Sequence, residues 1–118
     1  RERIIRVNNL IAKHEEEIAN PILDFIDTRT DLKLIGKNKI SNKNRAPTIS
    51  FTSNIKSSKE ISNILVSNKI ATRNDNFYAW RCLKNLGIDT GDGVVRISLT
   101  HYNTKNEVNK IIETLDKI

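Results

Sequence analysis

Residues 93–104, GVVRISLTHYNT, decide the fold that the sequence predicts. Apolar and polar side chains alternate through residues 94–99 after a Gly-Asp-Gly turn, and this pattern is typical of a half-buried β-strand. One face of the expected strand carries Val95, Ile97 and Leu99, and the other carries Val94, Arg96 and Ser98. A short polar connection then leads into a closing amphipathic helix. The stretch therefore predicts a strand that passes directly into the last helix of the chain.

Arg96, the charged residue of this strand, allows two interpretations. A solvated outer face is the simpler one, because charged side chains are rarely buried. The other starts from the guanidinium group, which can hold a carboxylate through two parallel hydrogen bonds. A strand is a stiff support for such a clamp. The alternation alone leaves both interpretations open.

Upstream, an apolar residue recurs every seven positions and predicts a long amphipathic helix. The repeat consists of Ile4, Ile11, Ile18 and Phe25. Pro21 interrupts the pattern, because proline lacks a backbone donor and clashes with the preceding turn. Either the helix kinks there, or a second helix begins with Pro21 in its first turn. His14 lies on the apolar stripe, where we expect a packed histidine of the core or an interface rather than a metal ligand.

The remaining elements are short. Strands are predicted at residues 32–36, 48–52 and 69–73, and helices from Ser57, at 77–86 and at 104–118. Two capping boxes support the helix starts, Ser57 with Glu60 and Thr104 with Glu107, and Gly87 is suited to a helix end. The order α-β-β-α-β-α-β-α predicts one two-layer α+β domain over residues 1–118. We expect a small, mostly antiparallel sheet of about four short strands, backed by the two terminal helices.

Two loops carry further candidate residues. Residues 73–80 contain three of the six aromatic side chains and lie at the start of a predicted helix. Phe77 and Trp80, at positions i and i+3, are expected to pack into the core, which leaves Tyr78 free to serve a site. In the loop before the last helix, His101 could reach past the end of the sheet, while the end of that loop caps the helix.

The charge of the chain is basic but scattered. The 20 Lys and Arg residues exceed the 14 Asp and Glu residues, which gives a net charge of +6. The densest basic stretch includes Lys37, Lys39 and Lys43, far along the chain from the aromatic side chains that a nucleic-acid site would add. A bias in composition explains the positive charge equally well as selection for an acidic partner. We therefore do not favour nucleic-acid binding. The alternative function is a free-standing basic α+β module that binds RNA or a protein partner.

Several classes of site find no support in the sequence. His14, His101 and Cys82 are isolated from one another, so no metal site is expected. No run approaches the roughly 18 apolar residues of a membrane span, and no Gly-rich phosphate loop precedes a helix. The chain contains no Met, and we therefore expect it to be part of a longer polypeptide.

Three segments together resemble one known family. They are residues 45–51 (RAPTISF), residues 73–80 (RNDNFYAW), and residues 93–104 followed by Glu107 and Val108. In this order they are similar to the C-terminal small domain of class V aminotransferases. These fold-type I pyridoxal phosphate (PLP) enzymes include the cysteine desulfurases. The resemblance runs from about Ile4 to the end of the chain and is strongest for a desulfurase-like subfamily with the motifs NFYA and HYNT.

The resemblance implies roles for several residues. The arginine that matches Arg96 binds the α-carboxylate of the amino-acid substrate, and the segment around residues 73–78 matches a loop over the active-site mouth. The candidate substrate-binding residues are therefore Arg96, Tyr78, Asn76, Arg73 and His101. Tyr78 stands where desulfurases have the cysteine that attacks the substrate sulfur, and Asp75 where the family usually has glycine. Cys82 lies one helical turn further on and does not match that motif.

The family's Schiff-base lysine follows a Ser-x-His motif in the large domain, and this motif is missing from the chain. The resemblance therefore implies a small domain with no catalytic residue of its own, inactive alone. The parent would be a PLP-dependent class V aminotransferase or desulfurase-like enzyme, homodimeric and cytoplasmic. Its small domain would have two partners, the N-terminal large domain of the same polypeptide and the amino-acid substrate.

Overall fold

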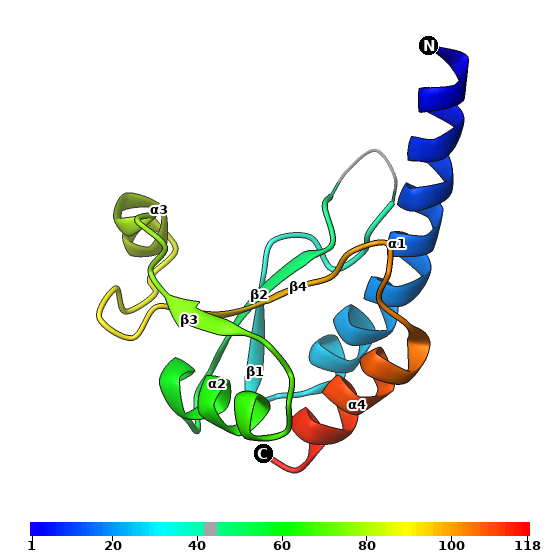
Figure 1. The fold of residues 1–118 in the computed structure, drawn as a ribbon. Coiled ribbons are helices and arrows are strands. Elements are labelled where there is room, and N and C mark those ends of the chain that lie inside the picture. Colours follow the sequence, from blue (N-terminus) through cyan, green and yellow to red (C-terminus); the bar gives the residue numbers. More distant parts are fainter. Residues whose placement is uncertain (42–44) are drawn as a thin grey trace.

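The computed structural model describes residues 1–41 and 45–118. The helices are α1 (Glu2–Thr28), α2 (Ser58–Ser67), α3 (Trp80–Asn85) and α4 (Lys105–Asp116), and the strands are β1 (Leu32–Ile35), β2 (Thr48–Ser53), β3 (Arg73–Asp75) and β4 (Val94–Ser98). The strands form one antiparallel sheet in the order β1-β2-β4-β3 (Figure 1). This arrangement confirms the predicted α+β class and the predicted order of the elements.

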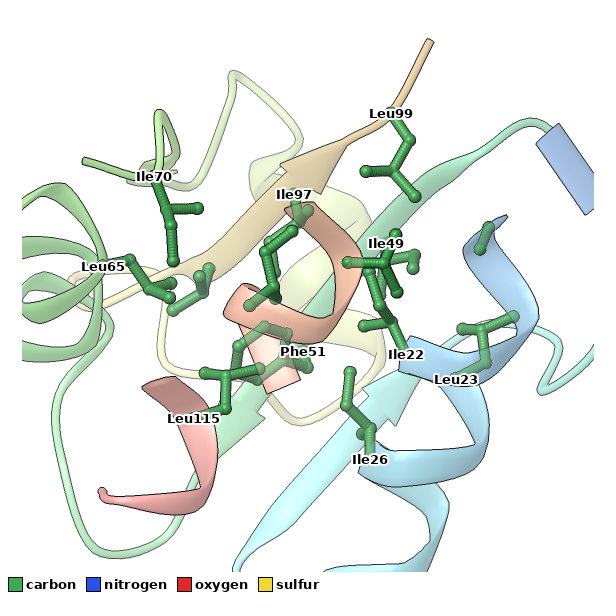
Figure 2. Close-up of a cluster of buried hydrophobic side chains, with 14 of the residues drawn as sticks. Ile22, Leu23, Ile26, Ile49, Phe51, Leu65, Ile70, Ile97, Leu99 and Leu115 are labelled. Carbon is green, nitrogen blue, oxygen red and sulfur yellow. The ribbon is translucent and has the colours of Figure 1, made fainter. Parts of the chain in front are cut away.

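The hydrophobic core lies between one face of the sheet and the helices α1, α2 and α4 (Figure 1). Figure 2 shows its side chains, among them Ile22, Leu23 and Ile26 of α1, Ile49 and Phe51 of β2, Leu65 of α2, Ile97 of β4 and Leu115 of α4. The predicted inward face of β4 is confirmed, because Val95, Ile97 and Leu99 are all buried. The two terminal helices back the sheet as predicted, and α2 joins them.

Helix α1 runs without interruption through Pro21. The predicted alternative of a second helix that begins at this proline is therefore wrong. The neighbouring Asn20 anchors the helix to the loop after β1: its Nδ2 donates to the Ile40 carbonyl at 3.1 Å, and its Oδ1 accepts from the Ile40 amide at 2.8 Å. These two bonds hold the buried Ile40 side chain against the core.

The two halves of α1 differ in packing. Only the second half contributes to the core, whereas residues 1–10 are exposed and project away from the sheet (Figure 1). The predicted apolar stripe is therefore not buried along its whole length, because Ile4 is 65% exposed; Leu10, outside that stripe, is 63% exposed as well. An exposed apolar helix face of this kind is typical of a surface that another protein segment covers.

Both predicted capping boxes are present. The Ser57 side chain accepts from the Glu60 amide, and the Glu60 carboxylate accepts from the Ser57 amide at 2.9 Å. Thr104 and Glu107 make the same reciprocal pair at the start of α4. Because these carboxylates accept hydrogen bonds in their charged form, the pKa of Glu60 and the pKa of Glu107 lie below their usual values. Glu107 thereby fixes the junction between β4 and α4.

The third strand lies further along the chain than predicted. We expected it at residues 69–73, but β3 spans Arg73–Asp75. Lys69 instead has a φ of 61° and belongs to the end of α2, where the Ile70 amide donates to the Leu65 carbonyl at 3.0 Å. A helix that ends in a left-handed residue closes in this way. Because Lys69 and Ile70 form this helix end, they are not part of a strand, and β3 begins only at Arg73.

The helix predicted at residues 77–86 is also shorter. Phe77 and Tyr78 have φ angles of 50° and 61°, so they form a left-handed loop and α3 begins only at Trp80. Non-glycine residues adopt this backbone region at a cost, and such residues concentrate at functional sites. Gly87, with a φ of 70°, ends the helix as predicted.

The basic stretch after β1 is partly engaged within the chain. Lys39 pairs with Asp24 of α1. Arg45 donates from Nη2 to the Thr48 carbonyl at 3.0 Å and from Nη1 to the Lys37 carbonyl. Lys43, the third lysine named for the alternative nucleic-acid function, lies outside the described residues. Among the described residues, no helix is both long and apolar enough to cross a membrane.

Candidate functional site

The outer face of the sheet, away from α1, α2 and α4, carries a row of side chains that crosses every strand. The register pairs Ile35 with Ser50, Ser50 with Arg96, and Arg96 with Arg73. Direct partners in antiparallel strands share a face of the sheet. Four side chains from β1, β2, β4 and β3 therefore stand next to one another, with Arg96 inside the row and half-buried.

Helix α3 covers part of this outer face. Val94, on the same side of β4 as Arg96, is only 4% exposed, and it lines a cavity of about 180 Å³ together with Leu83 and Leu86 of α3. The simpler interpretation of Arg96 was a solvated outer face. The structure shows that this face is only partly solvated. One side of Arg96 faces this small apolar cavity, which it also lines.

Phe77 supports the Arg96 side chain from the left-handed loop. The guanidinium carbon of Arg96 lies 4.0 Å from the centroid of the Phe77 ring. A cation stacked on an aromatic face in this way is attracted by the negative potential of the ring. Phe77 is half-buried and was expected in the core, but its ring contacts the outer face instead. Trp80, also expected in the core, is 58% exposed, so that prediction is wrong.

Asn76 holds the loop that presents Phe77. Its Oδ1 accepts from the Tyr78 amide at 3.0 Å, and its Nδ2 donates to the Thr90 carbonyl at 3.3 Å. The side chain thus ties the loop after β3 to the turn before β4. Because the Asn76 amide group is engaged on both sides, its visible role in this chain is to position Phe77 and Tyr78.

Gly93 permits the close approach of these two segments. It has a φ of 73°, and a Cβ built on it would lie 2.3 Å from the carbonyl carbon of Asp75 and 2.7 Å from the amide nitrogen of Asn76. No side chain fits in that space, and only glycine adopts this backbone conformation without strain. The glycine therefore brings the start of β4 against the end of β3, next to Arg96.

The other candidate residues occupy different places. Arg73 is exposed and lines a cavity of about 220 Å³ with Arg96, Ser98, Thr72 and Ala71. Tyr78 is fully exposed at the tip of its loop. His101 lies beyond the end of β4, where its ring contacts Tyr102 edge-to-face with 5.3 Å between centroids, and it lines neither cavity of Arg96. The structure thus groups Arg96 with Arg73 in one cavity and with Asn76 in the other.

Within residues 1–41 and 45–118, neither Arg96 nor Arg73 forms an ion pair. The ion pairs found there join Arg29 to Asp31 and to Asp116, and Lys39 to Asp24. No described carboxylate is therefore bound to the guanidinium group of Arg96 or Arg73. A carboxylate of a ligand could bind there without displacing a carboxylate of the protein.

Few described side chains in this region could bind a metal ion or hold a cofactor. The described residues contain no group of three or more His, Cys, Asp or Glu side chains able to hold a metal ion. No lysine lines either cavity of Arg96. Cys82 is exposed and lines the smaller cavity. His14, half-buried on α1, donates from Nε2 to the Asn103 carbonyl at 2.9 Å, so it links the first helix to the β4–α4 loop.

Comparison with known proteins defines the class. The family model for aminotransferase class-V matches residues 5–111, so the chain belongs to the class V aminotransferase family. An aminotransferase-like protein of Gibberella zeae is 29% identical over 109 residues, which cover 92% of this chain and 27% of that protein. This family is PLP-dependent.

Solved structures share the fold. A cysteine desulfurase from Thermococcus onnurineus superposes with a TM-score of 0.80 at 23% identity, over 92% of this chain and 26% of that one. The cysteine desulfurase CsdA of Escherichia coli gives a TM-score of 0.74 at 20% identity, over 90% and 24%. The chain therefore spans about a quarter of the length of the relatives it matches.

Sequence reasoning missed two residues of the site. Phe77 carried a signal, because three aromatic residues in a short loop are unusual, but its spacing to Trp80 favoured a buried helix. Gly93 stands in a recognisable Gly-Asp-Gly turn, yet the approach of Asp75 to it depends on the pairing of β3 with β4. Neither contact can be deduced from local sequence.

Proposed function

We propose that residues 1–118 form the C-terminal small domain of a PLP-dependent class V aminotransferase or desulfurase-like enzyme, and that this domain binds the α-carboxylate of the amino-acid substrate through Arg96. The observation that carries the proposal is the state of Arg96. It is half-buried on a strand, stacked on Phe77, and without an acidic partner among the described residues.

The geometry of Arg96 suits a carboxylate. The guanidinium carbon of Arg96 lies over the Phe77 ring, and among the described residues no hydrogen bond uses its side-chain N–H groups, so the N–H edge remains available to a ligand. Two parallel N–H···O bonds from this edge match the spacing of the two carboxylate oxygens. Since Arg96 lies on a strand paired on both sides, its backbone cannot move far when a ligand binds.

The cofactor would be held outside this chain. When bound, PLP would supply the electron-sink chemistry, and it would be held by a lysine that forms a covalent link to it. The cavities of Arg96 contain no lysine, so the residues of this chain do not by themselves fit the cofactor. We assign the cofactor to an N-terminal large domain of the same polypeptide, in a homodimeric cytoplasmic enzyme.

Two observations support a covering domain. The chain matches only about a quarter of the length of its relatives. In addition, the first half of α1 exposes apolar side chains, among them Ile4, Ile5 and Leu10, that a second domain would cover. In this arrangement the small domain would close over the substrate, with Arg96 facing the cofactor.

A pair of ligands tests the proposed function. The complete polypeptide should bind an L-amino acid at least about 100-fold more tightly than the amine that lacks its carboxylate, because a paired guanidinium–carboxylate contact contributes about 3 kcal/mol. Isothermal titration calorimetry with a panel of amino acids and their decarboxylated amines measures the ratio. Equal affinity for both members of every pair would contradict the proposal.

Phe77 should contribute to this affinity as a positioning residue. Replacing Phe77 by leucine keeps an apolar side chain but removes the ring, so we expect affinity for the amino acid to fall by about 3- to 10-fold, as for a cation–π contact of roughly 1 kcal/mol. Phe77→Tyr keeps the ring and should bind like the wild type. The amine without a carboxylate should bind equally to all three proteins; a matching loss for the amine would show that Phe77 acts elsewhere.

A further inference from the structure

A cavity of about 420 Å³ lies beside the core-facing side chains of β4, whereas Arg96 belongs to the opposite face of the strand. Three segments surround it: the turn between α2 and β3, the end of β4, and the first half of α4. Cavities of a few hundred Å³ are large enough to hold a small organic molecule. The function proposed above gives this cavity no role.

The cavity exists because β3 stops pairing with β4 before β4 ends. The pairing of the two strands reaches Arg73 with Arg96, whereas β4 continues to Ser98. Lys69, with a φ of 61°, turns the chain at the end of α2, so the residues that follow it do not extend the pairing. A gap therefore remains between this turn and the end of β4.

The floor of the cavity is apolar and fixed. Four of the side chains that line it are at most 9% exposed and belong to the hydrophobic core, namely Ile70, Ile97, Leu99 and Ile111 (Figure 2). They come from the turn after α2, from the end of β4 and from α4, whose positions the core sets. A preformed apolar floor with a few polar groups around it is typical of a small-molecule site.

The rim of the cavity carries positive charge. Lys69 and Lys110 are exposed there, and neither forms an ion pair with a described residue. Among the described residues that line the cavity, the one acid is Glu107. Its Oε2 accepts from the Thr104 amide at 2.7 Å and from the Thr104 hydroxyl at 3.1 Å, so this carboxylate serves the helix cap. The rim therefore favours an anion.

The end of β4 adds a backbone donor. The Leu99 amide donates to the Pro47 carbonyl at 2.9 Å, on the side of β2. Because backbone groups alternate in direction along a strand, the Ser98 amide points to the other side, where β3 no longer pairs. No described backbone carbonyl accepts from this amide. Since Ser98 lines the cavity, its N–H is available to an anionic oxygen.

We propose that this cavity binds a small organic acid. The apolar body of the acid packs on the four buried side chains of the floor, and its carboxylate lies at the rim between Lys69 and Lys110. The burial of the floor provides affinity for the apolar body, and the two lysines select for negative charge. The site goes beyond the proposed function and does not depend on it, because Arg96 does not line this cavity.

Three probes test the two halves of such a ligand: hexanoate, hexan-1-ol, which lacks the charge, and acetate, which lacks the apolar chain. The complete polypeptide carries Arg96→Gln in every titration, so that the proposed clamp does not bind the carboxylate. Isothermal titration calorimetry should show hexanoate binding about 10-fold more tightly than hexan-1-ol and about 100-fold more tightly than acetate, because each buried methylene adds roughly 4-fold. Equal affinity for hexanoate and either control, or no binding of hexanoate, would overturn the inference.

Lysine variants in the same background locate the carboxylate. Lys69→Gln and Lys110→Gln should each weaken hexanoate about 3- to 10-fold and change hexan-1-ol less than about 2-fold, because only hexanoate carries a charge. Lys84→Gln is the matched control: it removes the same charge from an exposed position on α3 that does not line the cavity, and it should bind hexanoate unchanged. If all three variants weaken hexanoate equally, or none does, the carboxylate does not lie at this rim and the inference fails.

Discussion

Replacing Arg96 by glutamine is expected to raise the KM of the proposed PLP enzyme for the amino acid it is proposed to bind about 100-fold. Glutamine keeps a polar side chain of similar length but loses the charge and the paired donors, which together contribute about 2–3 kcal/mol to carboxylate binding. Arg96 is half-buried beside Val94 and over Phe77, so the neutral side chain should fit without disturbing the sheet. Steady-state kinetics measures the KM, and the absorbance of the bound cofactor measures the cofactor content.

Two controls show whether a change in KM comes from the lost carboxylate contact. Arg96→Lys keeps the positive charge but not the planar fork, so its KM should lie between those of the wild type and Arg96→Gln. Cofactor content should be the same in all three proteins, because no residue of this chain is assigned to the cofactor. An unchanged KM in Arg96→Gln would remove Arg96 from the substrate site, whereas loss of the cofactor would show that the substitution disturbs more than the carboxylate contact.

Replacing Gly93 by alanine is expected to destabilise the domain by about 3 kcal/mol or more. Two physical costs add. The residue has a φ of 73°, where alanine is strained by about 1 kcal/mol, and the new Cβ would lie 2.4 Å from the Asp75 carbonyl oxygen. The backbone of β3 would have to move away from β4, and the loop that carries Phe77 would move with it. Urea unfolding of the chain, followed by circular dichroism, measures the free energy of unfolding.

Two other glycines separate these costs. Gly87 has a φ of 70°, but a Cβ there meets nothing within 4 Å, so Gly87→Ala reports the backbone cost alone. At Gly91 a Cβ would meet only the flexible Asp89 side chain, 3.3 Å away, so Gly91→Ala should cost less than about 1 kcal/mol. If Gly93→Ala costs no more than Gly87→Ala, then β3 does not approach β4 as closely as the structure shows.

The parts of the fold that local sequence could predict are those that depend on near neighbours. The alternation of residues 94–99 predicted the buried face of β4, and the capping pairs at Ser57 and Thr104 predicted two helix starts. In each case the decisive sequence signal lies within a few residues. The stripe on α1 was only half informative, because periodicity shows which face of a helix is apolar and not whether another segment covers it: Ile18 is buried, whereas Ile4 is 65% exposed.

The site could be predicted less completely, because its contacts join distant segments. The type of strand and the chemistry of the guanidinium made Arg96 a candidate, but its support by Phe77 depends on a left-handed loop that resembles the start of a helix in sequence. The pairing of Arg73 with Arg96 depends on the sheet order, in which β3 lies beside β4 and not beside β2. A strand order of this kind is set by the whole core.

The most direct test of the central claim is one comparison of four dissociation constants. The wild-type complete polypeptide and its Arg96→Gln variant are each titrated with an L-amino acid and with the amine that lacks the α-carboxylate. A carboxylate clamp predicts that the substitution weakens the amino acid about 100-fold and the amine less than about 3-fold. Equal weakening of both ligands, or of neither, would contradict the assignment of Arg96 to the substrate carboxylate.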